Sequence, residues 1–323
     1  MQRLRAFIID QFSKTLEIAA QLPFLEWHYI PNCTPQEAIE KFLPQAQILV
    51  LRSKISLNEQ TLAKAAHLQL VIRGGSGLEH IDINALKKRN IHLIATPAGN
   101  RDAVAEHVIG MLLCLLNNIA RANYQLKNYQ WEREGNRGYE IMGKTVGILG
   151  YGNTGSTLAK KLIGFGAKVI AYDKYKTGFG DNFAQEVSLK TFFQETDILS
   201  IHIPLDDLNY HFVDASFLNQ FSKPIWLINT ARGGVLDIVA ALNAFEKGKI
   251  LGMALDVFEN EDLTTFTADQ KATWQRLVQE ERIILTPHIA GWTFEAEERI
   301  AQLIVEALKD YALKVNLTSK EIN

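Results

Sequence analysis

The sequence is poor in cysteine and has no excess of basic charge. Only two cysteines occur in 323 residues, Cys33 and Cys114, and they lie far apart. This excludes the disulfide framework of a small secreted domain, and we expect a reduced, cytoplasmic protein. Lys and Arg number 34 against 36 Asp and Glu, which leaves a formal net charge of -2. Such a balance disfavours binding to nucleic acid, so the expected partners are small molecules or copies of the chain itself.

Long apolar runs and metal-binding spacings are also missing. The longest apolar stretch, VIGMLLCLL at residues 108–116, is far shorter than the roughly 20 residues that a membrane span needs. The opening MQRLRAFIIDQF lacks the apolar segment and cleavage site of a signal peptide. We therefore expect no leader and no membrane contact. No H-x-x-H or C-x-x-C pair occurs, and no metal site is expected.

The distribution of apolar runs predicts two α/β domains, since a prior of roughly 150 residues per domain divides this length in two. Strand-like runs at 6–10, 47–52, 68–73 and 91–96 alternate with helix-like segments. A helix-like stretch from about 102 to 128 and a polar loop follow. Six more runs begin at residue 145: TVGILG, KVIAYD, DILSIH, PIWLINT, GMALDVF and RIILTPH. Strands separated by crossover helices indicate doubly wound parallel sheets covered on both faces.

The last amphipathic stretch, TFEAEERIAQLIVEALKDYAL, lies beyond the second series of strands and has Thr293 as its expected N-cap. We expect this helix to pack on the first domain. The predicted boundaries are therefore 1–98 with 291–323 for one domain and 99–290 for the inserted one.

A glycine-rich turn follows the first strand of the inserted domain. Gly150, Gly152 and Gly155 have G-x-G-x-x-G spacing between a strand and a helix, which suits a tight turn, close approach of a pyrophosphate and close helix packing. Asp173 ends the next strand, where it can accept hydrogen bonds from both ribose hydroxyls. This favours NAD over NADP, although Lys174 is adjacent. A turn without a ligand, a flavin site and an S-adenosyl site are the alternatives. Asn153 and Thr154 belong to the same predicted cofactor site.

Further polar residues occur at predicted strand ends. Arg232 follows the strand INT and precedes two glycines, where a guanidinium can bind a carboxylate in bidentate fashion. A second glycine-rich turn, RGGSGLEHID, follows a strand of the first domain, and its amides at Gly75, Ser76 and Gly77 are expected to form an anion-binding concavity. The remaining predicted substrate residues are Arg52, Ser53, Lys54 and Arg73; solvated strand-end charges are the alternative.

These motifs in this order resemble the D-isomer-specific 2-hydroxyacid dehydrogenase family over nearly the full length. They are LRSK, GGSGLEHID, TPAGNRDAVAEH, GILGYGNTG, HIPL, NTARGGVLD, ALDVF and TPHIAG. Within the family, VLRSKISLNEQTL and VIRGGSGLEHID are most similar to D-3-phosphoglycerate dehydrogenases of the short form. The resemblance implies a Rossmann-type NAD-binding domain inserted in a flavodoxin-like substrate domain.

The resemblance also implies roles for single residues. The family's arginine falls on Arg232, its acid/base histidine on His288 and its glutamate on Glu261, although Glu259 is an alternative because Asp262 stands where the family usually has proline. The resemblance implies that Asn100 is at the interdomain hinge, and that the cofactor also meets Asp256 at the carboxamide, Thr230 and Ala231 along the nicotinamide, and His202 and Pro204 beside the adenosine.

Chemistry gives an independent reason for a histidine at position 288. Oxidation of a 2-hydroxy acid removes a hydroxyl proton as hydride leaves C2, and one imidazole can serve both directions. A carboxylate on its far nitrogen fixes the tautomer and stabilises the imidazolium, and Arg232 can bind the substrate carboxylate. A histidine that merely ends a strand is the alternative. His80 and His107 are expected on the first-domain side and carry less weight.

We expect 3-phosphoglycerate as the substrate, because Arg52, Lys54 and Arg73 offer positive charge for a phosphate. Reduction of glyoxylate or hydroxypyruvate is the alternative, and an NAD(H)-sensing, corepressor-like binding protein is the alternative of another class. The family commonly pairs through the region of the long apolar helix from Ala103 and the loop of Trp131, which predicts a homodimer.

Overall fold

The computed structural model describes residues 3–314, which belong to two compact units. Unit 1 contains Met1–Asn100 and Trp292–Asn323, and unit 2 contains Arg101–Gly291. The predicted boundaries, after residues 98 and 290, lie within two residues of these divisions. Both units are parallel-sheet α/β structures, so the predicted fold class is confirmed.

Unit 1 has a five-stranded parallel sheet in the order β2-β1-β3-β4-β5 among its described residues. The strands are β1 (Leu4–Ile8), β2 (Leu25–Tyr29), β3 (Ile48–Leu51), β4 (Leu70–Arg73) and β5 (His92–Ala95). No strand was expected at β2. Its sequence LEWHY is at an edge of the sheet and only Leu25 is buried, so it lacks the continuous apolar run of a central strand.

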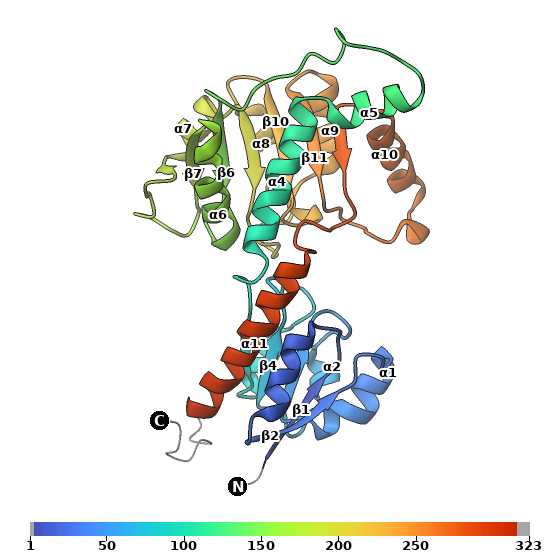
Figure 1. The fold of residues 1–323 in the computed structure, drawn as a ribbon, viewed down its shortest axis with the longest axis vertical. Coiled ribbons are helices and arrows are strands. Elements are labelled where there is room, and N and C mark those ends of the chain that lie inside the picture. Colours follow the sequence, from blue (N-terminus) through green and yellow to red (C-terminus); the bar gives the residue numbers. More distant parts are fainter. Residues whose placement is uncertain (1–2, 315–323) are drawn as a thin grey trace. The chain divides into compact units, whose positions relative to one another are not determined.

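Helices cover both faces of this sheet. They are η1 (Lys14–Gln21), α1 (Pro35–Glu37), η2 (Ala38–Phe42), η3 (Leu43–Gln45), α2 (Glu59–Leu62), α3 (Ile83–Lys88) and α11 (Phe294–Lys314). The last of these packs on unit 1 as expected (Figure 1). Ile300, Ile304 and Leu308 of α11 join Ile8 and Val50 in one core cluster. Alternate strand residues face a second cluster on the opposite side of the sheet.

Unit 2 has a seven-stranded parallel sheet in the order β12-β11-β10-β9-β6-β7-β8 among its described residues. Its strands are β6 (Thr145–Leu149), β7 (Lys168–Tyr172), β8 (Gln185–Glu186), β9 (Ile198–Ile201), β10 (Ile225–Asn229), β11 (Ile250–Leu255) and β12 (Ile283–Leu285). Six were predicted, and the two-residue edge strand β8 was not. From β6 the strand order continues to β7 and β8 on one side and returns to β9 on the other. The connections that follow β6 and β9 therefore diverge, and parallel sheets of this kind bind ligands at such a point.

The helices of unit 2 cover both faces of its sheet (Figure 1). They are α4 (Arg101–Leu116), α5 (Ile119–Lys127), α6 (Asn153–Leu162), η4 (Ile163–Phe165), α7 (Leu189–Glu195), α8 (Ala215–Asn219), η5 (Gly233–Val235), α9 (Ile238–Glu246), η6 (Leu263–Thr265) and α10 (Ala268–Gln279). Neighbouring strand residues such as Ile148 and Leu149 face opposite core clusters.

The single helix predicted for 102–128 is divided in two. Asn118 has a left-handed backbone, with φ of 54°, between α4 and α5. Asparagine tolerates this conformation better than most residues, so the break occurs where the sequence permits it. Among residues 3–314, no single helix is long and apolar enough to cross a membrane; α4 and α5 together have the length and composition, but they are bent by 60°.

Candidate active site

The glycine-rich turn after β6 has the geometry of a phosphate cradle. Gly150 has a φ of +97°, and a Cβ there would lie 2.8 Å from the carbonyl oxygen of His202. A Cβ on Gly155 would lie 2.2 Å from the carbonyl oxygen of Gly150, so only glycine lets α6 come this close to the turn. A Cβ on Gly152 would meet nothing within 4 Å. The turn is therefore open at Gly152, where a pyrophosphate has to approach, and Asn153 and Thr154 begin the helix beside it.

Asp173 follows β7 and is fixed beside this turn. Its Oδ2 accepts the amide of Tyr151 at 2.9 Å, and its Oδ1 accepts the amides of Tyr175 at 2.9 Å and Lys176 at 3.1 Å. The lysine ammonium also donates to the carbonyl of Tyr151. These bonds hold the carboxylate at the end of β7. Its predicted contact with ribose remains a prediction.

The residues predicted beside adenosine follow β9. His202 Nε2 lies 2.7 Å from the Ser200 hydroxyl. Burial lowers the pKa of His202 to about 4, so the ring is neutral at pH 7. Pro204 is exposed, and its carbonyl accepts the side-chain amide of Asn209 at 3.2 Å. The turn that begins with Pro204 is thus tied to the buried Asn209.

The end of β10 carries Thr230, Ala231 and Arg232. Asn229 is buried and holds this turn, since its Oδ1 accepts the amide of Ala231 at 3.0 Å and its Nδ2 donates to the carbonyl of Arg232 at 3.0 Å. Asn229 was not among the predicted site residues. The sequence feature that could have identified Asn229 is a polar residue at the end of an otherwise apolar strand. The Thr230 hydroxyl is buried without a hydrogen-bond partner among residues 3–314, so it can serve a ligand at the nicotinamide side.

His288 and Glu261 form a direct pair. Nδ1 of His288 lies 2.8 Å from Oε2 of Glu261. Burial raises the pKa of Glu261, but the hydrogen bond and charge of His288, the Phe258 amide and the charge of Arg232 outweigh it. The pKa of Glu261 is therefore below its usual range. Glu259 instead pairs with His211, which resolves the choice between the two glutamates in favour of Glu261.

Arg232 belongs to the same cluster. A Cβ on the next residue, Gly233, would lie 1.9 Å from the carbonyl carbon of Phe258. The turn of Arg232 therefore packs directly on the segment that leads to Glu261. The guanidinium itself donates from Nη1 to the carbonyl of Ala231 at 2.6 Å. The three residues predicted to carry the chemistry thus come together in unit 2.

The backbone of His288 is in the left-handed region, with φ of 54°. Its amide donates to the Asp256 carbonyl at 2.8 Å. The Asp256 carboxylate is fully buried and accepts the amides of Ile289 at 2.9 Å and Ala290 at 2.8 Å and the hydroxyl of Thr286 at 2.6 Å. Asp256 is therefore the anchor of the histidine turn, a role that the sequence did not reveal. Its predicted contact with the carboxamide remains a prediction.

His107 also lies close to Asp256 and Thr286. Its Nε2 lies 3.1 Å from the hydroxyl of Thr286 and 3.6 Å from Oδ1 of Asp256. The expectation that His107 is on the first-domain side was wrong, because the residue belongs to α4 of unit 2. The sequence feature that could have indicated a role for His107 is a histidine within an otherwise apolar helix.

In unit 1, two of the predicted substrate cations are already engaged. The Arg52 guanidinium lies 4.8 Å from the ring centroid of Phe12 and 5.2 Å from that of Trp292, and its Nη2 donates to Glu297 at 3.1 Å. The ammonium of Lys54 donates to the carbonyls of Pro31 and Cys33. Lys54 thus ties its own strand end to a neighbouring loop, and its predicted contact with a substrate phosphate remains a prediction.

The second glycine-rich turn is only partly as predicted. The amide of Gly75 donates to the hydroxyl of Thr96 at 2.8 Å, so it is not the free donor that the sequence predicted. The amides of Ser76 and Gly77 have no hydrogen-bond partner among the described residues. Nη1 of Arg73 donates to the Gly74 carbonyl at 2.9 Å. Ser53 is exposed beside Arg52, and Asn100 is the last residue of unit 1 before α4.

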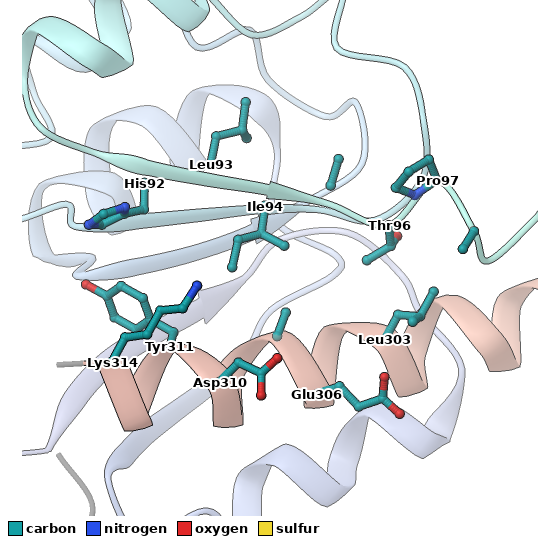
Figure 2. A pocket seen from close by; sticks show the side chains of 13 residues that line it. His92, Leu93, Ile94, Thr96, Pro97, Leu303, Glu306, Asp310, Tyr311 and Lys314 are labelled. Atoms are coloured by element: carbon teal, nitrogen blue, oxygen red, sulfur yellow. The ribbon is translucent and has the colours of Figure 1, made fainter. Parts of the chain in front are cut away.

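A separate cavity of about 660 Å³ lies in unit 1 between β5 and the second half of α11 (Figure 2). Ile94 and Thr96 of β5 and its continuation face Glu306, Asp310 and Tyr311 of the helix across it. None of the predicted site residues lines this cavity. Among the described residues, no group of three His, Cys, Asp or Glu side chains is arranged to hold a metal ion.

Comparison with known proteins bears on the whole chain. The model of the D-isomer specific 2-hydroxyacid dehydrogenase, NAD binding domain, matches residues 109–290. The chain is 33% identical over 273 residues to a hydroxypyruvate reductase of Thermotoga maritima, with 84% of this chain and 87% of that protein covered. It is 31% identical over 269 residues to a D-3-phosphoglycerate dehydrogenase of Mycobacterium leprae, which covers 83% of this chain but only 49% of that protein.

A solved structure agrees with these matches. The D-lactate dehydrogenase from Aquifex aeolicus, complexed with NAD and lactic acid, has a TM-score of 0.81 and 28% sequence identity, with 97% of this chain and 96% of that chain covered. The resemblance read from the motifs and the NAD cofactor are thereby confirmed.

Proposed function

The chain belongs to the D-isomer-specific 2-hydroxyacid dehydrogenase family, and we propose that Arg232, Glu261 and His288 carry out its chemistry. The observation that supports this most is the 2.8 Å pair between His288 and Glu261 beside the turn of Arg232. A histidine backed by a carboxylate is the arrangement that reversible proton transfer requires.

NAD would be held by the glycine turn and by the residues at the ends of β7 and β10. The open position at Gly152 and the unpartnered hydroxyl of Thr230 fit such a ligand. Asp173 would accept the ribose hydroxyls. When bound, the nicotinamide supplies or accepts the hydride that is exchanged with C2 of the substrate.

The protein's own residues handle the proton and the carboxylate. Since Nδ1 of His288 is bonded to Glu261, Nε2 is the nitrogen left to give a proton to the C2 oxygen in reduction and to remove it in oxidation. The lowered pKa of Glu261 keeps its carboxylate ionised, which favours the imidazolium form that donates. Arg232 would bind the substrate carboxylate and polarise the C2 oxygen.

For the substrate, we propose a small 2-oxo acid such as hydroxypyruvate or glyoxylate, which are reduced to the 2-hydroxy acids. Two of the cations expected to bind a phosphate, Arg52 and Lys54, are engaged within unit 1. The relative of similar length is a hydroxypyruvate reductase. The predicted pair of 3-phosphoglycerate and 3-phosphohydroxypyruvate, and with it a place in serine biosynthesis, remains the second candidate. It is supported by the unpartnered amides of Ser76 and Gly77 and by the D-3-phosphoglycerate dehydrogenase relative.

NADH oxidation with equal concentrations of hydroxypyruvate, glyoxylate and 3-phosphohydroxypyruvate separates these candidates. We expect kcat/KM for one of the first two to exceed that for the phosphorylated acid at least tenfold. The opposite ranking would restore the phosphoglycerate assignment. Binding of NADH without turnover of any 2-oxo acid would favour the NAD(H)-sensing, corepressor-like protein, which has no need for the pair between His288 and Glu261.

A homodimer is proposed as the assembly. No residue of α5 is buried, and Ile119, Tyr124 and Leu126 are each more than half exposed. Tyr129 and Trp131 in the following loop are 100% and 86% exposed. A second copy would cover this apolar surface. The cytoplasmic location expected from the two cysteines remains a prediction.

A further inference from the structure

A second histidine–glutamate pair lies two residues from Glu261. Oε1 of Glu259 is 2.8 Å from Nε2 of His211, and its Oε2 accepts the Tyr210 hydroxyl at 3.2 Å. The two rings are stacked, with centroids 4.0 Å apart and planes at 16°. The charge of Glu259 is the main cause that raises the pKa of Tyr210. One carboxylate is therefore gripped by two stacked side chains, which we call the Glu259 clamp.

The clamp is built on a strained backbone. His211 has a φ of 50°, a left-handed conformation that is uncommon for residues other than glycine. Its amide donates to the Gly234 carbonyl at 2.7 Å, and Val213 forms a bridge to Leu236. The turn that carries the clamp is therefore attached to the segment that follows Arg232. Strain of this kind persists only where the surroundings enforce it, and it is concentrated at functional sites.

Glu259 also lies where two segments of the site touch. A Cβ on Gly233 would lie 2.4 Å from the amide nitrogen of Glu259. The clamp thus joins three pieces of chain: the turn of Tyr210, the turn of Arg232 and the loop that leads to Glu261. Movement of any one of them would displace the others.

The loop has internal restraints, since Asn260 bonds to Thr265 and Asp262 bonds to Thr264, but few of them act on Glu261 itself. The residue after Glu261 is Asp262, so no pyrrolidine ring fixes the backbone there. The side chain of Asp262 is used to cap η6 through the amide of Thr264 at 3.0 Å. Within the loop, Glu261 accepts only a long bond of 3.4 Å from the amide of Phe258.

We propose that Tyr210 and His211 are positioning residues for the reaction: by gripping Glu259 they fix the loop that delivers Glu261 to His288. This inference rests on the proposed function, since it assigns the pair of Glu261 and His288 the proton transfer. Neither Tyr210 nor His211 has to touch the substrate or the cofactor.

The test uses two variants that remove the grip with little disturbance. Tyr210→Phe deletes one hydroxyl and keeps the stacked ring. His211→Asn removes the imidazole and retains a residue that tolerates a left-handed backbone. His28→Asn is the matched control, because His28 pairs with Glu26 at 3.1 Å on unit 1. We expect the double variant Tyr210→Phe/His211→Asn to lower kcat roughly tenfold, as loss of supporting bonds commonly does, with the Kd for NADH within twofold of the parent and the control unaffected.

A double-mutant cycle distinguishes positioning from general structural support. In a Glu261→Ala background, which has no side-chain acceptor for Nδ1 of His288, the two clamp substitutions should lower kcat less than twofold, because they act only through Glu261. The same tenfold loss in both backgrounds, or no loss in the parent background, would overturn the proposal.

A measurement that does not depend on catalytic turnover tests the Glu259 clamp separately from the proposed function. The proton on Nδ1 of His288, identified by its loss in His288→Gln, should give a downfield resonance in the NMR spectrum of the intact protein. We expect this resonance to shift or broaden in His211→Asn and to stay unchanged in His28→Asn. An unchanged resonance in His211→Asn rejects the clamp, whereas failure of the proposed function would appear as unimpaired turnover in His288→Ala.

Discussion

The carbonyl of Asp256 accepts the amide of His288 at 2.8 Å, and the carboxylate of the same aspartate accepts the amides of the next two residues. One buried side chain thus determines where the imidazole lies, although it is 32 positions away in the sequence (288 − 256).

Asp256→Asn should therefore impair both stability and catalysis. The N–H group of an amide would face one or more of the three groups that now donate to the carboxylate. Buried donors would then have no acceptor, at a cost of about 1–3 kcal/mol. We expect this loss in the free energy of unfolding, measured by urea, together with a lower kcat. Asp310→Asn is the control, because Asp310 of α11 is exposed, and it should change neither quantity. Normal stability and kcat in Asp256→Asn would mean that the turn does not depend on this carboxylate.

His288→Ala should lower kcat by roughly 10²- to 10⁴-fold, the usual contribution of a general acid/base. Binding of NADH, followed by its fluorescence, should be retained, because the glycine turn and Asp173 are unaltered. Glu261→Gln should have a smaller effect, since an amide can still accept from Nδ1 but provides no charge. Undiminished turnover in His288→Ala would reject the mechanism.

Substitution of two glycines in the cradle should separate folding from cofactor binding. Gly155→Ala places a methyl group 2.2 Å from the Gly150 carbonyl oxygen, so we expect a lower melting temperature. Gly152→Ala meets no protein atom within 4 Å, and it should keep the melting temperature but weaken NADH binding. Calorimetry of the apoprotein and titration with NADH measure the two effects. Equal NADH affinity in Gly152→Ala and the parent protein would contradict close approach at this residue.

The stability of the protein should fall with acid partly because of His202. Burial lowers the pKa of His202 from 6.5 to about 4. Below pH 6.5 the unfolded chain therefore binds a proton that the folded chain does not. The contribution is fully present above pH 6.5 and is lost as the pH falls toward 4. Between pH 7.5 and 5 the loss is about 2 kcal/mol, and urea unfolding should show it in the parent but not in His202→Gln. An identical pH dependence in the two proteins would argue that His202 titrates normally.

Charge on the exposed face of α5 should dissociate the proposed dimer. Leu126 and Trp131 are 56% and 86% exposed, so Leu126→Glu with Trp131→Glu should cost the fold little. We expect sedimentation to report a dimer for the parent protein and a monomer for the double variant at micromolar concentration. A monomeric parent protein would overturn the assignment.

The sequence was most informative where chemistry depends on local spacing. Gly150, Gly152 and Gly155, Asp173 and the strand-end residues Arg232 and His288 were predictable because each occupies a fixed place after a strand. The choice between Glu259 and Glu261 was not, because both lie in one loop and the partner that occupies Glu259, His211, is 48 positions away.

Bonds between a side chain and a distant segment could not be predicted either. Lys54 has the pattern of a ligand-binding cation, but the carbonyls of Pro31 and Cys33 that accept its protons belong to a loop earlier in the chain. The strand β2 was missed since an edge strand needs only one buried residue, and α4 was predicted too long because a break at Asn118 costs little.

The division of the chain has a consequence for its synthesis. Unit 2 is one continuous segment, whereas the core of unit 1 includes Ile300, Ile304 and Leu308, which are translated after the whole of unit 2. Since translation proceeds from the N-terminus, about 100 residues of unit 1 emerge from the ribosome first and must wait, with an apolar sheet face uncovered, until the whole inserted unit has been made. Synthesis of α11 therefore completes the core of unit 1 only after unit 2 has been made.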